Sequence, residues 1–93
     1  MNYIDRIAGN IGDRCGMCMS DPEQRRLLRL YAVLALTRGW STTREDVHNA
    51  WAAWRLETRP EHPAIVPFAL LDGPTQELDE PYRKAIADVA RSL

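Results

Sequence analysis

The sequence lacks any apolar run close to the roughly 20 residues that a membrane-spanning helix needs. Its first ten residues also lack the form of a signal peptide, because Asp5 and Arg6 interrupt their apolar pattern. We therefore expect a cytoplasmic protein with no membrane contact.

Positive charge is not in excess either. The chain has 12 basic and 13 acidic residues and a net charge of −1. A near-neutral balance argues against sequence-independent binding to nucleic acid, which depends on a positive field. Lys84 is the only lysine beside 11 arginines. The arginine excess has two explanations, which are a compositional bias of the genome and a use of planar guanidinium groups to contact phosphate or carboxylate.

Cysteine is scarce, and the only Cys-x-x-Cys pair is Cys15 and Cys18. A structural zinc site needs four ligands, and His48 and His62 do not have the spacing of a zinc motif. A redox motif would need a βαβ context that the sequence does not show. We expect two reduced cysteines in a loop, with zinc binding and redox chemistry as the alternatives and no cofactor.

Motifs of catalysis are missing as well. The sequence has no Ser-His-Asp spacing, no glycine-rich phosphate loop and no His-Glu-x-x-His. The acidic pairs Glu45-Asp46 and Asp79-Glu80 are explained by the preference for negative charge in the first turn of a helix. We therefore expect a binding protein and not an enzyme.

What the sequence does contain is helical periodicity, and 93 residues suffice for one domain, spanning residues 1–93. Asp21, Pro22 and Gln24 form a strong helix start, and Gly39 is a natural helix end. Apolar residues cover most of this helix, which predicts a central, nearly enclosed position. Ser41, Thr42 and Thr43 are alternative caps for the next helix, and Thr42 with Glu45 would complete a capping box. Pro60 ends this helix.

We predict an all-α fold of four to five helices, with this order of elements: helix 2–12, loop 13–20, helix 22–38, helix from 44 to before 60, proline-rich loop 58–66, short turns 67–71 and 75–79, and a last helix from 80.

The third helix and the loop after it concentrate the unusual side chains. Two tryptophans one turn apart, Trp51 and Trp54, fit either a hydrophobic core or a stacking surface for a ligand. A histidine on the same face, His48, fits either a core hydrogen bond or a ligand contact. The prolines around His62 lower the entropy of the loop, so that a site there would be pre-formed. The candidate ligand-binding residues are His48, Trp51, Trp54, Arg55, Arg59, His62 and Phe68.

The segment EDVHNAWAAWR, followed by HPAIVPFALLDGPTQELDEPY, resembles the RyR domain, a small module named for its repeats in ryanodine receptors. The resemblance covers residues 45–84 and rests on these positions: His48, Trp51, Arg55, His62-Pro63, Val66-Pro67-Phe68, Leu71 and Asp79. The spacing between Arg55 and His62 is shorter than in that family, because the segment that usually lies between them is missing here. Residues 1–40 are more similar to small proteins of actinobacteria and their phages. The resemblance implies a helical module that senses a ligand or a partner and has no enzymatic activity.

Three hypotheses of function follow. The first is a binding module for a small anionic ligand of the nucleotide type, with a tryptophan on the base, Arg55 and Arg59 at phosphate, and His62 and Phe68 closing the cleft. The second is an assembly protein without a small ligand, which would join its protomers as a symmetric homodimer. The third is DNA binding, since a helix, a turn and a capped helix follow one another at residues 34–51, although the acidic start of the second helix disfavours it.

Overall fold

The computed structural model describes residues 2–93 and confirms the all-α prediction. Within these residues there are five α-helices, no strand, and two single-turn 3-10 helices, η1 and η2. The chain forms one small domain with extents of 35 × 26 × 21 Å. The elements are α1 (Tyr3–Cys15), α2 (Pro22–Thr37), η1 (Gly39–Ser41), α3 (Arg44–Thr58), η2 (Phe68–Leu70), α4 (Gly73–Glu77) and α5 (Glu80–Arg91).

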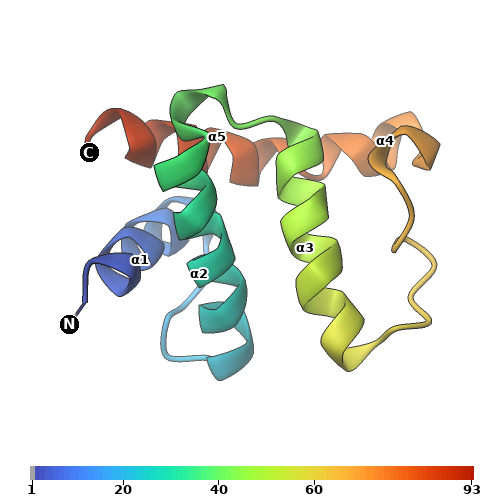
Figure 1. The fold of residues 1–93 in the computed structure, drawn as a ribbon, viewed down its shortest axis with the longest axis horizontal. Helices are drawn as coiled ribbons and strands as arrows, with labels where there is room; N and C mark the ends of the chain where they lie inside the picture. The colour runs from blue at the N-terminus through green and yellow to red at the C-terminus, as the bar shows by residue number, and fades with distance from the viewer. Residues whose placement is uncertain (1) are drawn as a thin grey trace.

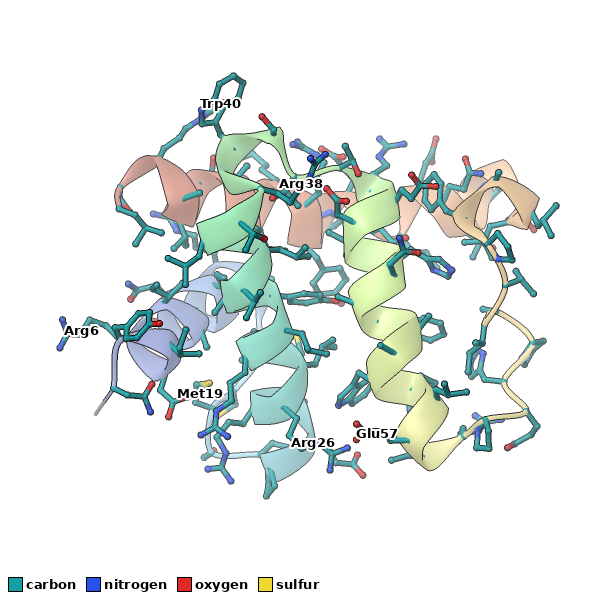
Figure 2. The ribbon with its side chains drawn as sticks, in the orientation of Figure 1. Arg6, Met19, Arg26, Arg38, Trp40 and Glu57 are labelled. Atoms are coloured by element: carbon teal, nitrogen blue, oxygen red, sulfur yellow. The ribbon has the colours of Figure 1, made fainter. Side chains whose placement is uncertain are left out.

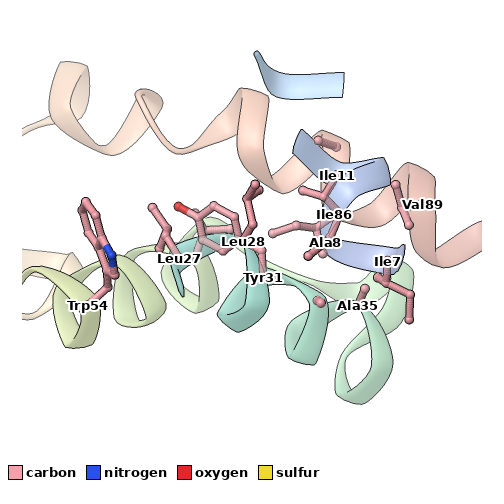
Figure 3. Close-up of a cluster of buried hydrophobic side chains, with 13 residues drawn as sticks. Ile7, Ala8, Ile11, Leu27, Leu28, Tyr31, Ala35, Trp54, Ile86 and Val89 are labelled. Atoms are coloured by element: carbon pink, nitrogen blue, oxygen red, sulfur yellow. The ribbon is translucent and has the colours of Figure 1, made fainter. Parts of the chain in front are cut away.

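The helices form a core on one side of the molecule and leave α3 on the other. In Figure 1, α2 and α3 run side by side in opposite directions, and α5 crosses behind their upper ends. Helix α1 packs against α2 and α5. Figure 3 shows the apolar side chains of these three helices meeting in one cluster. Because α3 contributes few residues to this cluster, its inner face is left to line a cavity.

The start of α2 agrees with its prediction. The Asp21 carboxylate accepts hydrogen bonds from the amides of Glu23 (2.9 Å) and Gln24 (3.3 Å), and Pro22 occupies the first turn. Gln24 was expected to complete a capping box with Asp21, but its side chain instead accepts a hydrogen bond from the Cys18 amide at 2.7 Å. The same side chain therefore fixes the loop between α1 and α2.

The prediction that α1 ends at Gly12 is wrong. The helix continues to Cys15, and Gly16, with a φ of 79°, provides the left-handed residue at its end. Gly12 lies inside the helix at a close approach. A Cβ atom there would lie 2.8 Å from the Met17 carbonyl oxygen and 3.0 Å from Leu28 Cδ1. The glycine is needed for packing of α1 against α2, and not for ending the helix.

Two other details of the prediction are also wrong. The capping box of Thr42 and Glu45 is absent, because the buried Thr42 hydroxyl donates to the Gly39 carbonyl at 2.7 Å. Thr43, another of the three candidate caps, forms the box with Asp46 instead. Helix α2 is not nearly enclosed, because its outer face exposes the apolar residues Leu30, Val33 and Leu36. The neighbouring helices cover only the opposite face of α2, which carries Leu27, Leu28, Tyr31, Ala32 and Ala35.

The helices after α3 follow the sequence closely. Residues 59–67 form the proline-rich loop, and η2, α4 and α5 come after it, with Pro81 in the first turn of α5. Helix α5 buries its apolar side chains Ala85, Ile86 and Val89 in the core, whereas Leu93, beyond the end of the helix, is exposed. None of the helices in residues 2–93 has the length and apolar character to cross a membrane.

Candidate functional site

The main cavity of the structure lies between α2 and α3 and has a volume of about 690 Å³. This volume falls in the range of about 300–1,000 Å³ that is usual for small-molecule sites. Residues of all five helices, the α1–α2 loop and the proline-rich loop line it. The lining residues with polar or aromatic side chains are Cys15, Gln24, Tyr31, His48, Trp51, Trp54, His62, Thr75, Asp79 and Tyr82.

Four of the seven predicted site residues line this cavity, and they come from α3 and the loop after it. They are His48, Trp51, Trp54 and His62. The His48 and Trp51 rings are stacked, with centroids 5.7 Å apart, and the His62 ring meets Trp51 edge-on at 5.1 Å. The prediction that helix and loop share one cavity therefore agrees with the geometry.

His48 is a structural residue as well as a lining residue. It is only 3% exposed, and its Nε2 lies 2.7 Å from the Val66 carbonyl oxygen. This bond ties the proline-rich loop to α3. The Nδ1 of His62 accepts a hydrogen bond from the Ala64 amide at 3.1 Å, which shapes the same loop. The core hydrogen bond expected of His48 is thus present, and the same residue also lines the cavity.

The two tryptophans differ in burial. Trp54 is 7% exposed, and its Nε1 donates to the Glu23 carbonyl oxygen at 2.9 Å, which links α3 to the first turn of α2. Trp51 is only partly buried and lines the cavity. Trp51 is therefore the better placed of the two for stacking on a ligand.

The other three predicted residues are outside the cavity lining. The Arg55 guanidinium lies 4.2 Å from the centre of the Trp54 ring, and its Nε is buried without a hydrogen-bond partner in residues 2–93. Arg59 is exposed and lies 3.5 Å from the Glu61 carboxylate. Phe68 packs against His48 from the loop side, with ring centroids 6.0 Å apart. The structure does not bring Arg55 and Arg59 to the space that Trp51 faces.

Sequence reasoning missed the opposite wall of the cavity, which α2 and α5 provide. Tyr31 and Tyr82 lie there with ring centroids 6.0 Å apart, and Asp79 is at the start of α5. Figure 3 shows the Tyr31 hydroxyl pointing away from the isoleucine and valine cluster, toward Leu27 and Trp54. A tyrosine among the core-facing residues of each helix was the available signal, since a buried phenolic group needs a polar neighbour.

Burial shapes the electrostatics of this wall. It raises the pKa of the Tyr31 hydroxyl far above its usual value. Burial also raises the pKa of the Asp79 carboxyl, against the opposite effect of His48 and Arg44. Next in the chain, hydrogen bonds from Arg83 and Arg44 lower the pKa of Glu80 to about 2. Two adjacent carboxyl groups therefore have very different environments.

The two cysteines are free thiols; Cys15 is the last residue of α1, and Cys18 is exposed in the loop that follows. The expectation that both lie in a loop is therefore wrong for Cys15. Burial raises the pKa of Cys15, which lines the cavity. The contact of Cys18 Sγ with Ser20 Oγ, at 2.8 Å, lowers the pKa of Cys18. Across residues 2–93, no three His, Cys, Asp or Glu side chains gather as a metal-binding group.

Comparison with known proteins identifies the family. Residues 2–91 match the model of a domain of unknown function, DUF7701, and the chain belongs to that family. No curated protein and no solved structure matches the chain. The resemblance to the RyR domain is wrong, since the match over nearly the whole chain is to a different family. Its His-Pro motif has a local explanation here, because His62 and His48 both serve to hold the loop through Ala64 and Val66.

Proposed function

We propose that this protein is a binding module that holds a small organic ligand in the cavity between α2 and α3 without converting it chemically. The observation that carries the proposal is an aromatic-lined cavity of about 690 Å³ with several polar residues in its lining. Mostly apolar pockets with a few convergent polar groups are the usual form of small-ligand sites. A domain of 93 residues has a marginal core, so ligand binding would also add to its stability.

The nucleotide-type ligand of the first hypothesis has partial support from the geometry. A flat base could stack on Trp51, whose ring is only partly buried. The phosphate contacts lack support, because neither Arg55 nor Arg59 lines the cavity. A nucleotide bound there would have its phosphates outside the cavity, in reach of solvent.

Tryptophan fluorescence tests the proposal directly. Trp40 is 66% exposed and projects from the upper edge of the molecule in Figure 2, so that Trp40→Phe leaves only the two cavity tryptophans as reporters. A panel of cyclic nucleotides, ADP-ribose-type nucleotides and small aromatic amines and acids is titrated into this variant. A ligand of the cavity changes the emission in a saturable way and raises the melting temperature.

A matched pair of variants shows where a ligand binds. Ala64→Phe places a ring in the cavity lining, and Ala69→Phe places the same ring at an exposed position of the same segment. We expect Ala64→Phe to abolish binding and Ala69→Phe to retain it. If every ligand of the panel fails to bind, or binds equally to both variants, the proposal is wrong.

The assembly hypothesis has a separate observation in its favour. The outer face of α2 and the residues near it expose large apolar side chains: Tyr3 (66%), Leu30 (37%), Val33 (46%), Leu36 (46%) and Trp40 (66%). Exposed apolar patches often mark protein–protein contacts. Light scattering on the protein and on a Val33→Ser/Leu36→Ser variant tests this function. A dimer that the double variant disrupts would support it, and a strict monomer at millimolar concentration would exclude it.

DNA binding has the weakest support of the three. The arginines at the turn before α3 are engaged in ion pairs, Arg38 with Asp46 at 2.9 Å and Arg44 with Glu80 at 2.9 Å. Groups neutralised in this way add little to the attraction of phosphate. A gel shift that weakens with added salt would be the result in favour of this function.

A further inference from the structure

The polar groups of the cavity differ in kind from those expected for an anion site. The lining contains the Asp79 carboxylate and two histidines, His48 and His62, but no arginine and no lysine. The other polar lining groups are neutral, and they belong to Gln24, Tyr31, Thr75, Tyr82 and Cys15. The Asp79 carboxylate would repel an anionic ligand in this cavity. Only a protonated histidine would offer such a ligand a positive charge.

The hydrogen bond of His48 determines which of its nitrogens can face a ligand. A carbonyl oxygen only accepts hydrogen bonds, so the Nε2 that lies 2.7 Å from the Val66 oxygen carries the proton. In the neutral ring, Nδ1 is then an acceptor. Within residues 2–93, Nδ1 has no hydrogen-bond partner, so that a lone pair is available at the cavity.

Asp79 is the second acceptor, and its carboxylate is not used by the fold. It stands at the N-cap position of α5, yet its side chain makes no capping hydrogen bond. No ion pair or side-chain hydrogen bond of Asp79 is present in residues 2–93, and the groups close enough to influence it are His48, Arg44 and Tyr31. Arg44 is already bound to Glu80, as is Arg83. A half-buried carboxylate without a partner is costly, and a bound cation would compensate that cost.

Aromatic rings surround the same space. Trp51, Trp54, Tyr31 and Tyr82 all line the cavity. The faces of such rings attract cations, and the attraction grows when the site excludes water. The carboxylate and the rings therefore favour the same sign of charge on a ligand.

We propose that the ligand of this cavity is a small organic cation, a flat apolar body with a protonated nitrogen group that donates hydrogen bonds to Asp79 and to Nδ1 of His48. The inference rests on the proposed function and adds the charge and the shape of the ligand. Trp51 receives the flat body, and the protonated group lies at the end of the cavity where α3 meets the start of α5. Aryl amidines and amines joined to a ring through an alkyl carbon belong to this class.

Three probes with the same ring separate the effect of charge from that of shape. They are benzamidine, which is cationic, benzamide, which is neutral, and benzoate, which is anionic. Their dissociation constants are measured with the full chain by ligand-observed NMR, which detects affinities in the millimolar range, at about pH 8 so that Asp79 is ionised. We expect benzamidine to bind about tenfold more tightly than benzamide, and benzoate to bind least.

Substitutions at Asp79 and at a matched acidic residue test the origin of the preference. Asp79→Asn keeps the shape and removes the charge, and Glu77→Gln makes the same change at an exposed residue of α4 outside the lining. We expect the preference for benzamidine to disappear in Asp79→Asn and to persist in Glu77→Gln. Asp79→Ser, which suits a helix N-cap, provides a second variant if the first one folds poorly.

The outcomes separate this inference from the proposed function. Equal binding of all three probes, abolished by Ala64→Phe, would leave the cavity as the binding site but overturn the inference about charge. Tighter binding of benzoate would also overturn it and would favour an anionic ligand. If no probe binds at ~10 mM, a level at which even weak fragments bind, the inference about charge is wrong, whereas the proposed function fails only if the wider ligand panel fails as well.

Discussion

A hydrogen bond between Trp54 and Glu23 joins the C-terminal part of α3 to the first turn of α2. The indole Nε1 donates to the Glu23 carbonyl oxygen at 2.9 Å, although 31 residues separate the two in sequence. The Arg26–Glu57 ion pair lies at the same end of the two helices, as Figure 2 shows, but both of its side chains are largely exposed. The buried indole bond is therefore the stronger determinant of the width of the cavity at this end.

Trp54→Phe should reduce the free energy of unfolding by about 1–3 kcal/mol, because it removes a buried hydrogen bond and leaves a small void. Chemical denaturation followed by circular dichroism measures the change. The control is Trp40→Phe, at a ring that is 66% exposed, which should change the stability by less than about 0.5 kcal/mol. Equal effects of the two substitutions would contradict the assigned role of Trp54.

Two glycines of α1 should respond in opposite ways to the same substitution. Gly12→Ala should destabilise the protein by about 1–3 kcal/mol, since the new Cβ atom collides with the Met17 carbonyl and Leu28. Gly9→Ala should stabilise it by about 0.5–1 kcal/mol, since the nearest atom to its Cβ, Met19 Cγ, is at 3.8 Å and alanine is the better helix former. Melting temperatures of the two variants give the comparison, and a stabilising Gly12→Ala would show that α1 and α2 are not in close contact.

His48→Leu should loosen the proline-rich loop. The substitution leaves the Val66 carbonyl oxygen without its donor and should cost about 1–3 kcal/mol. It should also increase cleavage within residues 59–67 by a protease, because the loop loses its bond to α3. Asn49→Leu, at the next and exposed position of α3, should leave the cleavage rate unchanged. Should both variants be cut at the wild-type rate, the loop is held by other contacts.

The stability of the protein should depend on pH in opposite ways through Asp79 and Glu80. Because burial raises the pKa of Asp79 in the folded state, its ionisation lowers stability as pH rises from its ordinary value of 3.8 to the folded value. Asp79→Asn should therefore be more stable than the wild type at neutral pH and equal to it below 3.8. Thermal unfolding from about pH 2 to pH 8 measures the difference.

Glu80 provides the opposite case. Arg83 and Arg44 lower its pKa to about 2 from an ordinary value of 4.5, so its contribution is complete above 4.5 and is lost as pH falls toward 2. Glu80→Gln should be less stable than the wild type at neutral pH and should approach it at the acid end of the same series. A neutral-pH loss for Asp79→Asn that equals the loss for Glu80→Gln would contradict the environments described for both carboxyl groups.

The start of α2 and the end of α3 were the parts of the fold most open to prediction. Asp21-Pro22 and Pro60 act within one turn of their own positions, so their effect on α2 and α3 is set by the local backbone. The errors at Gly12 and on the outer face of α2 have a different origin. Helical periodicity counts apolar residues, but it does not say on which side a neighbouring helix will pack. Gly12 proved to be a contact point and Leu36 proved to be exposed for that reason.

The candidate site likewise has one part that the sequence predicts and another part that it does not. The sequence by itself determined that α3 and the proline-rich loop carry the aromatic and histidine side chains, because residues one turn apart share a helix face and prolines hold a loop close to its helix. Only the tertiary structure decided that Tyr31, Asp79 and Tyr82 lie across from them and that Arg55 and Arg59 do not. A cavity forms where helices distant in sequence fail to touch, and the distance between α2 and α3 depends on long-range contacts such as Trp54 with Glu23.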